Sequence, residues 1–327
     1  MDKKIFVFAL GALLFAVSLT AEAQQATKIA RIGFLSTTSL TAVSARIEAF
    51  RQGLRDLGYV EGKNIVFEWR SAEGKADLLQ ELAAELVRLN VDIIVTAGAG
   101  DTKVAKNATN TIPIVMAQDG DPVASGFVAS LARPGRNITG LSTLAPELSG
   151  KQLDLLKEVI PKLTRVAVFA TSTRVGNAQS LKEIELAAGA FKAKVQYLDL
   201  LAPKDIETAF REARKGRSEA LLVLQSPVFF AQRKQIADLA IKSQLPAIYP
   251  QTEYPEAGGL MCYGANTPDL FRRAATYVDK ILKGRTPADL PVEQPVKFEF
   301  IVNLKAAKAI GLTIPPNVLV RADRVIK

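Results

Sequence analysis

The sequence predicts an α/β protein in which two lobes, each built on a parallel β-sheet, are joined by several hinge crossings. Short apolar runs alternate with amphipathic helical segments, which is typical of βαβ units whose sheet is buried on both faces. The alternation occurs in two series along the chain, and 327 residues are enough for two domains of ordinary size. Hydrophobic residues make up 48% of the sequence, so both lobes can fill a core.

The first series begins with an apolar strand at 29–35, followed by a helix. Val43, Ile47 and Phe50 recur in that helix at offsets of four and three residues, which places them on one face. Further strands are expected at 64–69, 91–96 and 112–116, with helices at 78–89 and from about residue 101. Asp101 is expected to cap the last of these helices.

The second series repeats the same rhythm. Strands are expected at 165–170, 194–200, 220–224 and 246–249. Apolar residues at helical spacing indicate helices at 181–188, 206–213 and 236–240. Because a helix separates each pair of consecutive strands, the second sheet is also expected to be parallel.

The boundaries between the lobes are expected where turn residues interrupt this rhythm. Crossings are predicted at 137–146, at 257–263, where Gly258 and Gly259 give a flexible joint, and at 284–291. Residues 24–143 and 260–286 would form the N-terminal lobe, and residues 144–259 and 287–327 the C-terminal lobe. This arrangement is that of a hinged clamshell with a cleft between its lobes.

Residues 1–23 have the plan of a secretory signal peptide. Lys3 and Lys4 precede an apolar run of 15 residues from Ile5 to Leu19, and Ala21-Glu22-Ala23 supplies small residues at a cleavage site. The run falls short of the ~20 residues that span a bilayer, which disfavours the alternative of an uncleaved anchor. We therefore expect a mature chain that begins at Gln24 and is soluble in the periplasm.

The composition argues against several classes of protein. The sequence has no histidine and a single cysteine, Cys262, so neither an internal disulfide nor a Ser-His or Cys-His catalytic arrangement is expected. The same shortage argues against zinc and copper sites, and we expect neither metal nor cofactor. The net charge of +9 comes from scattered residues, with pairs such as Arg272-Arg273 on predicted helices, which argues against nucleic acid as a partner.

Small polar residues follow most of the predicted strands, and ligands of parallel sheets bind beyond the carboxyl ends of the strands. The expected ligand-binding residues are Ser36, Thr37, Gly98, Ala99, Asp119, Asp121, Thr171, Ser172, Gln225, Tyr249 and Thr252. Hydroxyl and backbone N–H groups would hold a carboxylate. Asp119 or Asp121 would pair with an ammonium group, and Tyr249 would cover an apolar part. Helix capping is the alternative role for each of the polar residues.

Two other patterns carry less weight. Glu253 and Glu256 have the chemistry of an acid/base pair, but their place in a proline-rich stretch favours solvated loop charges. Gly98 and Gly100 lack the third glycine of a dinucleotide-binding turn. Neither pattern predicts an enzyme.

Several long stretches of the chain resemble a known family. The matching segments are residues 30–36, 50–70, 112–143, 263–295 and 300–316. They resemble the extracytoplasmic substrate-binding proteins of ABC transporters, of the tryptophan/tyrosine type. Asp121-Pro122 matches the Asp-Pro of the family motif, and residues 137–140 match its Asn-x-Thr-Gly crossing. Gln118 and Asp119 stand where the family varies, so the ligand need not be tryptophan.

This resemblance implies a type I periplasmic-binding-protein clamshell, a small-molecule ligand and an ABC permease in the cytoplasmic membrane as partner. The sequence thus predicts a monomeric solute-binding protein that holds a small amino acid, or an organic or aromatic carboxylate, between its lobes. A ligand-sensing module acting on a membrane receptor is one alternative. A periplasmic enzyme that uses Asp, Glu or Lys as its base is another. The export signal and the missing N-terminal helix-turn-helix exclude a cytoplasmic repressor of the same shape.

Overall fold

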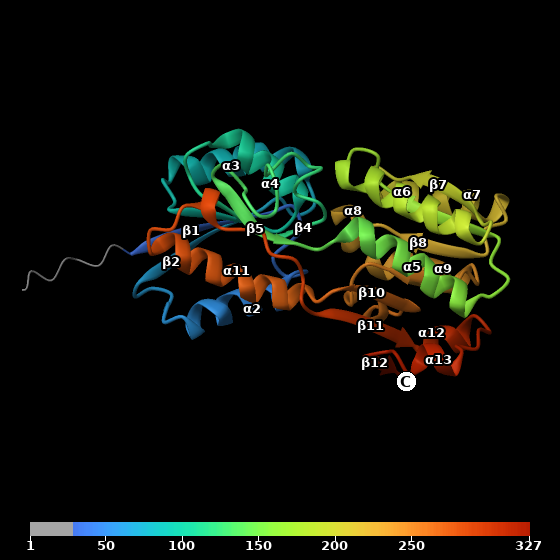
Figure 1. The fold of residues 1–327 in the computed structure, drawn as a ribbon. Helices are drawn as coiled ribbons and strands as arrows, with labels where there is room; N and C mark the ends of the chain where they lie inside the picture. The colour runs from blue at the N-terminus through green and yellow to red at the C-terminus, as the bar shows by residue number, and fades with distance from the viewer. Residues whose placement is uncertain (1–28) are drawn as a thin grey trace, which may run out of the picture.

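The computed structural model describes residues 29–327, which form two α/β lobes lying side by side (Figure 1). The predicted signal peptide at 1–23 and the predicted mature N-terminus at Gln24 lie outside the described residues. Within residues 29–327, none of the helices combines the length and the apolar character needed to cross a membrane.

The first lobe is built on a five-stranded parallel sheet of order β2-β1-β3-β4-β5. Its strands are β1 (Ala30–Ser36), β2 (Ile65–Ser71), β3 (Ile93–Thr96), β4 (Ile114–Asp119) and β5 (Ile138–Ser142). Helices α2 (Ser44–Asp56) and α11 (Thr267–Leu282) lie on one face of the sheet, and η2 (Ala76–Leu78), α3 (Leu79–Arg88) and α4 (Ala99–Ala108) belong to the other (Figure 1). The strands and helices expected in the first series are therefore present.

Alternation along β1 shows why this sheet needs helices on both faces. Ile32 and Phe34 belong to the apolar cluster that includes Phe50 of α2, whereas Leu35 belongs to the cluster that includes Leu86 of α3. Successive residues of a strand point to opposite faces of the sheet. All of these side chains are buried because helices cover both faces. The carboxyl end of β1 is thereby fixed beside those of β3 and β4.

The second lobe is built on a seven-stranded sheet of order β12-β11-β10-β9-β8-β6-β7. Its strands are β6 (Arg165–Ala170), β7 (Lys194–Asp199), β8 (Ala220–Val223), β9 (Ala247–Tyr249), β10 (Met261–Ala265), β11 (Phe298–Asn303) and β12 (Arg324–Ile326). Only the pairing of β10 with β11 is antiparallel among the described strands. The expected α/β class with two parallel-sheet lobes is confirmed, with one antiparallel pair added near the edge of the second sheet.

Helices cover both faces of the second sheet as well. They are α5 (Ala145–Val159), α6 (Val175–Ala190), η3 (Pro203–Asp205), α7 (Ile206–Lys215), α8 (Pro227–Ala231), α9 (Arg233–Lys242), α10 (Glu253–Glu256), α12 (Leu304–Ala309) and α13 (Pro316–Leu319). Val166 and Val168 pack with α5 and α6, whereas Ala167 and Phe169 pack with α7 and α9. The loops after β6 and β8 are thus held at the edge that faces the first lobe.

Within residues 29–327 the chain crosses between the lobes three times: from β5 to α5, from β10 to α11, and from η4 (Pro287–Asp289) to β11 (Figure 1). Strand β10 pairs with β9 and β11 in the second sheet, so the return to the first lobe follows Ala265. This differs from the expected boundary at residue 260, because the pairing of β10 with β11 is a long-range contact that periodicity does not report. Asn266 begins α11 at this crossing by accepting a hydrogen bond from the N–H of Asp269 at 2.7 Å.

The third crossing also lies later than expected. The N–H of Val292 donates to Leu131 at 2.7 Å, and the N–H of Glu293 donates to Gly140 at 3.0 Å, both in the first lobe. Residues 287–293 therefore remain with the first lobe, although 287–327 was expected to belong to the second. The crossing itself is made by residues 294–297, directly before β11.

Candidate functional site

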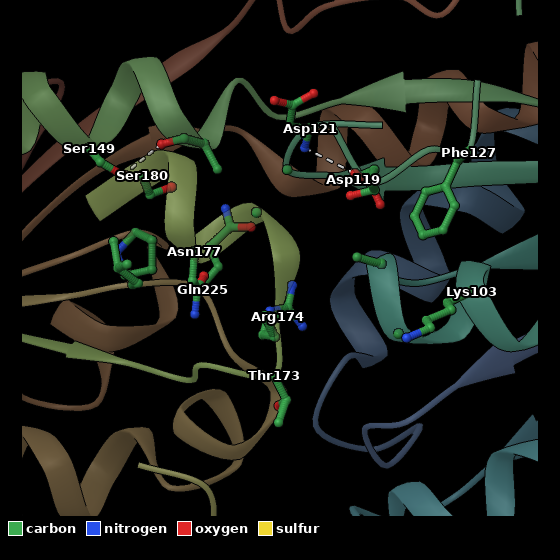
Figure 2. Close-up of a pocket in the computed structure, with 18 of the residues that line it drawn as sticks. Lys103, Asp119, Asp121, Phe127, Ser149, Thr173, Arg174, Asn177, Ser180 and Gln225 are labelled. Carbon is green, nitrogen blue, oxygen red and sulfur yellow. Dashed lines mark hydrogen bonds between the residues drawn. The ribbon is translucent and has the colours of Figure 1, made fainter. Parts of the chain in front are cut away.

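A cavity of about 360 Å³ lies between the lobes, at the carboxyl ends of their strands. The first lobe lines it with α4 and the segment after β4, and the second lobe with α5, the start of α6 and the ends of β8 and β9 (Figure 2). A smaller cavity of about 50 Å³ is lined by α2, α8 and the loop after β1. Asp119, Arg174 and Gln225 line both cavities, so the two form one interlobe cleft.

Asp119 is the last residue of β4 and is 2% exposed. Its Oδ1 accepts a hydrogen bond from the N–H of Asp121 at 3.0 Å, and its Oδ2 has no hydrogen-bond partner among the described residues. Burial raises the pKa of Asp119 to about 7, although the positive charge of Arg174 and the N–H of Asp121 act in the opposite direction. A buried carboxylate with an unused oxygen has capacity for one more donor.

Arg174 comes from the second lobe, directly before α6, and lies across the cleft from Asp119 (Figure 2). Burial lowers the pKa of Arg174, while the negative charges of Asp119 and Asp101 raise it. These charge interactions connect the two lobes, because both acids belong to the first lobe. The cleft therefore carries positive charge opposite negative charge.

Asp101 supports the loop after β1 and does not cap α4 as expected. Helix α4 begins at Ala99 without a side-chain cap, and Asp101 lies within its first turn. Oδ1 of Asp101 accepts hydrogen bonds from the N–H and the hydroxyl of Thr37, at 2.8 and 2.5 Å. Burial raises the pKa of Asp101 to about 6 against the effect of these bonds.

The remaining walls of the larger cavity have apolar side chains on the flanks and small polar side chains from α5 and α6. The apolar residues are Phe127, Ala145, Leu148, Leu224 and Pro250. Ser149, Ser180 and Asn177 project from α5 and α6 (Figure 2). Ser149 donates to the carbonyl of Ala145 at 2.7 Å. A ligand in this cavity would meet charged groups between the lobes and small polar groups toward α5 and α6.

Seven of the expected ligand-binding residues line the interlobe cleft. Ala99, Asp119, Asp121 and Gln225 line the larger cavity, and Ser36, Thr37 and Gly98 line the smaller one, together with Ala99, Asp119 and Gln225. The expectation that ligands bind beyond the carboxyl ends of parallel strands, here called the carboxyl-edge rule, therefore selected residues that are far apart in sequence but line one cleft. Across residues 29–327, no cluster of three or more His, Cys, Asp or Glu side chains is arranged to hold a metal ion.

Thr171, Ser172, Tyr249 and Thr252 line neither of these cavities. The hydroxyl of Thr171 donates to the carbonyl of Leu200 at 3.0 Å, and the N–H of Ser172 donates to Asp199 at 2.8 Å. Tyr249 is fully buried and stacks on Tyr254, with 4.6 Å between the ring centroids. The polar residues at the end of β6 thus support their own loop, and Tyr249 belongs to the core of the second lobe.

The larger cavity is also lined by residues that were not expected from the sequence, among them Phe127, Ser149, Arg174, Asn177 and Ser180. Arg174 and Asn177 follow the end of β6 by four and seven residues, so extending the carboxyl-edge rule through the first turn of α6 would have found both. Phe127 lies in a loop, and Ser149 and Ser180 lie within helices. No local sequence signal distinguishes these three from ordinary loop and helix residues.

Glu253 and Glu256 do not form an acid/base pair. Oε1 of Glu253 forms an ion pair with Nη2 of Arg46 at 2.6 Å. Oε1 of Glu256 forms an ion pair with Nη2 of Arg324, also at 2.6 Å. Both acids lie in the short helix α10, whereas solvated loop charges were expected. Each carboxylate has its own cationic partner, so they have no shared chemistry.

A family model described as ABC transporter substrate binding protein matches residues 28–326. A curated protein named tyrosine-binding protein, from Clostridioides difficile (strain R20291), is 25% identical over 265 residues, which are 81% of this chain and 76% of that protein.

Two solved structures are similar in fold. One is an ABC domain from Streptococcus pneumoniae in complex with L-Trp, with a TM-score of 0.85 and 24% identity over 91% of this chain and 99% of the other. The second is the ligand-free, open structure of a substrate-binding protein with adhesive properties from Clostridium difficile. It has a TM-score of 0.68 and 25% identity, again over 91% and 99% of the two chains.

Proposed function

Because the chain belongs to the ABC transporter substrate-binding proteins, we propose that it binds an amino acid with an apolar or aromatic side chain. The observation that carries this proposal is the buried carboxylate of Asp119, which lines the larger cavity and has one oxygen without a partner among the described residues. An ammonium group supplies the missing donor in a charge-assisted hydrogen bond. Asp121 lines the same side of the cavity and adds to its negative charge.

The carboxylate of such a ligand would be held by donors from both lobes. Arg174 and Asn177 line the cavity where α6 begins, and α4 begins there from the first lobe. The first N–H groups of a helix have no partner within the helix and carry partial positive charge, so they favour a carboxylate. Guanidinium groups bind carboxylates with two parallel hydrogen bonds.

The apolar flanks favour a hydrophobic or aromatic side chain. Phe127, Leu148, Leu224 and Pro250 line the cavity, whose volume of about 360 Å³ lies near the lower limit for small-molecule sites. A single amino acid therefore fits better than a peptide or a nucleotide. The ligands named for the related proteins, tyrosine and L-Trp, support this size and chemistry.

The relative position of the lobes supports a closed conformation. The TM-score is 0.85 to the complex with L-Trp and 0.68 to the ligand-free, open structure. Both comparisons cover 91% of the chain at similar identity, so the difference is attributed to the arrangement of the lobes. Hinged closure around a ligand is the usual transition of such two-lobed proteins.

We also propose that the protein is exported, cleaved after Ala23, and works as a monomer that delivers its ligand to a membrane permease. The charged, apolar and small-residue order of residues 1–23 supports export. Sequencing the N-terminus of periplasmic material tests the cleavage, and the first residue should be Gln24. Recovery of the chain with Met1 in the membrane would contradict it.

A thermal-shift screen of the amino acids, followed by calorimetry, tests the ligand class. A ligand at 100 times its Kd should add about 2.7 kcal/mol to the free energy of unfolding. Asp119→Asn should weaken binding about tenfold to a hundredfold, because it removes the charge that pairs with the ammonium group. Asp154→Asn is the matched control, because Asp154 is exposed on α5 and lies outside the cavity.

Two results would contradict the proposal. The first is that no amino acid raises the stability of the protein in the screen. The second is that the Asp119→Asn variant binds the ligand as tightly as the Asp154→Asn variant does. In the first case the ligand belongs to another chemical class. In the second case the ammonium group does not contact Asp119.

A further inference from the structure

Arg46 connects the two lobes at a place remote from the three chain crossings in sequence. It lies in the first turn of α2, in the first lobe, and its side chain is 5% exposed. Its Nη2 and Nε donate to Oε1 of Glu253 at 2.6 and 3.0 Å. Glu253 begins α10 in the second lobe and is 207 residues away along the chain.

The same guanidinium also packs on an aromatic ring of the second lobe. The Cζ atom of Arg46 lies 4.4 Å from the ring centroid of Phe230, which is on α8 and is 4% exposed. The ring of Phe230 lies edge-to-face against Tyr254, with 6.5 Å between centroids. Arg46 thus projects from the first lobe into a site made by a carboxylate and an aromatic face of the second lobe.

This group of three residues, Arg46, Phe230 and Glu253, is here called the Arg46 cluster. Arg46 and Phe230 line the smaller cavity, on the side of the cleft formed by α2 and α8. The larger cavity lies between α4 and the helices α5 and α6. The Arg46 cluster therefore lies on the side of the cleft formed by α2 and α8, and none of its residues lines the larger cavity.

Separating the lobes would change the surroundings of each member of the cluster. Water can hydrate Arg46 in an open form, whereas the closed form buries it and leaves Glu253 and Phe230 as its partners. Oε2 of Glu253 is buried and has no partner among the described residues, so the carboxylate depends on Arg46 through its other oxygen. Removing either residue abolishes an interlobe ion pair that the closed form makes and an open form does not, so it shifts the equilibrium toward the open form.

We propose that the Arg46 cluster is a latch that stabilises the closed form and so sets the affinity of the cleft. Arg46 is a positioning residue in this proposal, since it acts on the equilibrium between open and closed forms. The closure can be measured without a ligand, while the effect on affinity rests on the proposed amino-acid binding. Affinity falls in proportion to the population of the binding-competent form.

Small-angle scattering of the ligand-free protein tests the latch with four variants. Arg46→Met keeps most of the packing on Phe230 and removes the charge, and Glu253→Gln keeps the size of the side chain. The double variant tests whether the two residues act as one unit. Glu256→Gln is the matched control, because Glu256 lies in the same helix and pairs with Arg324 inside the second lobe.

We expect both single variants and the double variant to have the same, larger radius of gyration, while Glu256→Gln matches the parent protein. Circular dichroism melting of each variant verifies that it is folded. For a ligand found in the amino-acid screen, Kd should rise about tenfold in Arg46→Met and in Glu253→Gln. The proposal is overturned if all the proteins have one radius of gyration, or if Glu256→Gln expands as much as Glu253→Gln. Failure to find a ligand would contradict the proposed function and leave the scattering result to decide the latch.

Discussion

At the scale of single residues, Asp119 contributes to the dependence of stability on pH. Burial raises its pKa from 3.8 to about 7, so the folded protein retains a proton that the unfolded chain releases near pH 4. Between these values the folded state binds more protons, and the free energy of unfolding therefore falls as pH rises. The stabilisation is complete below about pH 4 and is lost as pH rises through about 7.

We predict that Asp119→Asn reduces the loss of stability between pH 5 and pH 8, by on the order of 1–3 kcal/mol. Asparagine has nearly the same shape and does not titrate, so it removes this contribution to the pH dependence. Urea unfolding at the two pH values measures the change. Asp101, whose pKa burial raises to about 6, should retain a smaller dependence of the same sign.

Ser149→Ala is the control for this experiment, because it alters the same cavity and removes no ionisable group. Its free energy of unfolding should change between pH 5 and pH 8 as much as that of the parent protein. An equal pH dependence in Asp119→Asn and the parent would show that Asp119 does not carry the raised pKa.

The sequence predicted Asp119 and Asp121 but missed Arg174 for a physical reason. An arginine after a strand is usually solvated, and its place in the sequence does not indicate that Arg174 is half-buried opposite two acids of the other lobe. Tyr249 shows the reverse error, because an aromatic residue at a strand end is as suited to the core as to a ligand. Burial depends on the packing of both lobes, which no short segment encodes.

At the scale of secondary-structure elements, Gly140 fixes how β5 packs against β4. Its φ is +135°, and a Cβ atom built there would lie 2.2 Å from the carbonyl oxygen of Met116. A side chain would push the two strands apart at the position where their register shifts, between Met116 and Asp119. The glycine of the Asn-x-Thr-Gly motif is therefore explained by backbone packing, without any ligand contact.

We predict that Gly140→Ala lowers the free energy of unfolding by about 3 kcal/mol or more, because steric overlap adds to backbone strain. Gly126→Ala is the matched control. Gly126 also has a positive φ, of +66°, but has no atom within 4 Å of the added Cβ, so the cost should be about 1 kcal/mol. Equal losses in the two variants, measured by urea unfolding, would show that the contact with Met116 is unimportant.

Most elements were predictable because each strand and helix has its own periodicity. Apolar runs such as that of β6 and the helical spacing of Val43, Ile47 and Phe50 are local signals. The pairing of β10 with β11 is different, because 32 residues separate Ala265 from Phe298, and α11 lies between them. The lobe boundary was therefore placed six residues too early, although the strand rhythm before it was read correctly.

At the scale of the whole molecule, the two lobes share their chain so closely that neither is a continuous segment. Helix α11 completes the first lobe after the chain has built most of the second, and β11 and β12 complete the second lobe afterwards. Gly53 of α2 lies so close to α11 that an added Cβ would be 2.5 Å from the carbonyl oxygen of Arg272. Unfolding of one lobe therefore lowers the stability of the other.

We predict a single calorimetric transition on heating, with equal calorimetric and van't Hoff enthalpies, despite the two lobes. The reason is that three crossings connect the cores, and unfolding one lobe removes the anchor of the segments that return to the other. Ligand should raise the midpoint of this single transition. Two resolved transitions, only one of which responds to ligand, would contradict the prediction.

The late return of α11 also has a consequence for the nascent chain. Helix α2 ends at Asp56 and its partner α11 begins at Thr267, so 210 residues must be synthesised between them. At about 5–20 residues per second this takes roughly 10–40 s, during which the face of α2 that includes Gly53 lacks the cover that α11 later provides. The first lobe is thus begun first but cannot be finished until the second is largely made. During that interval its uncovered face is a place where a chaperone would bind the growing chain.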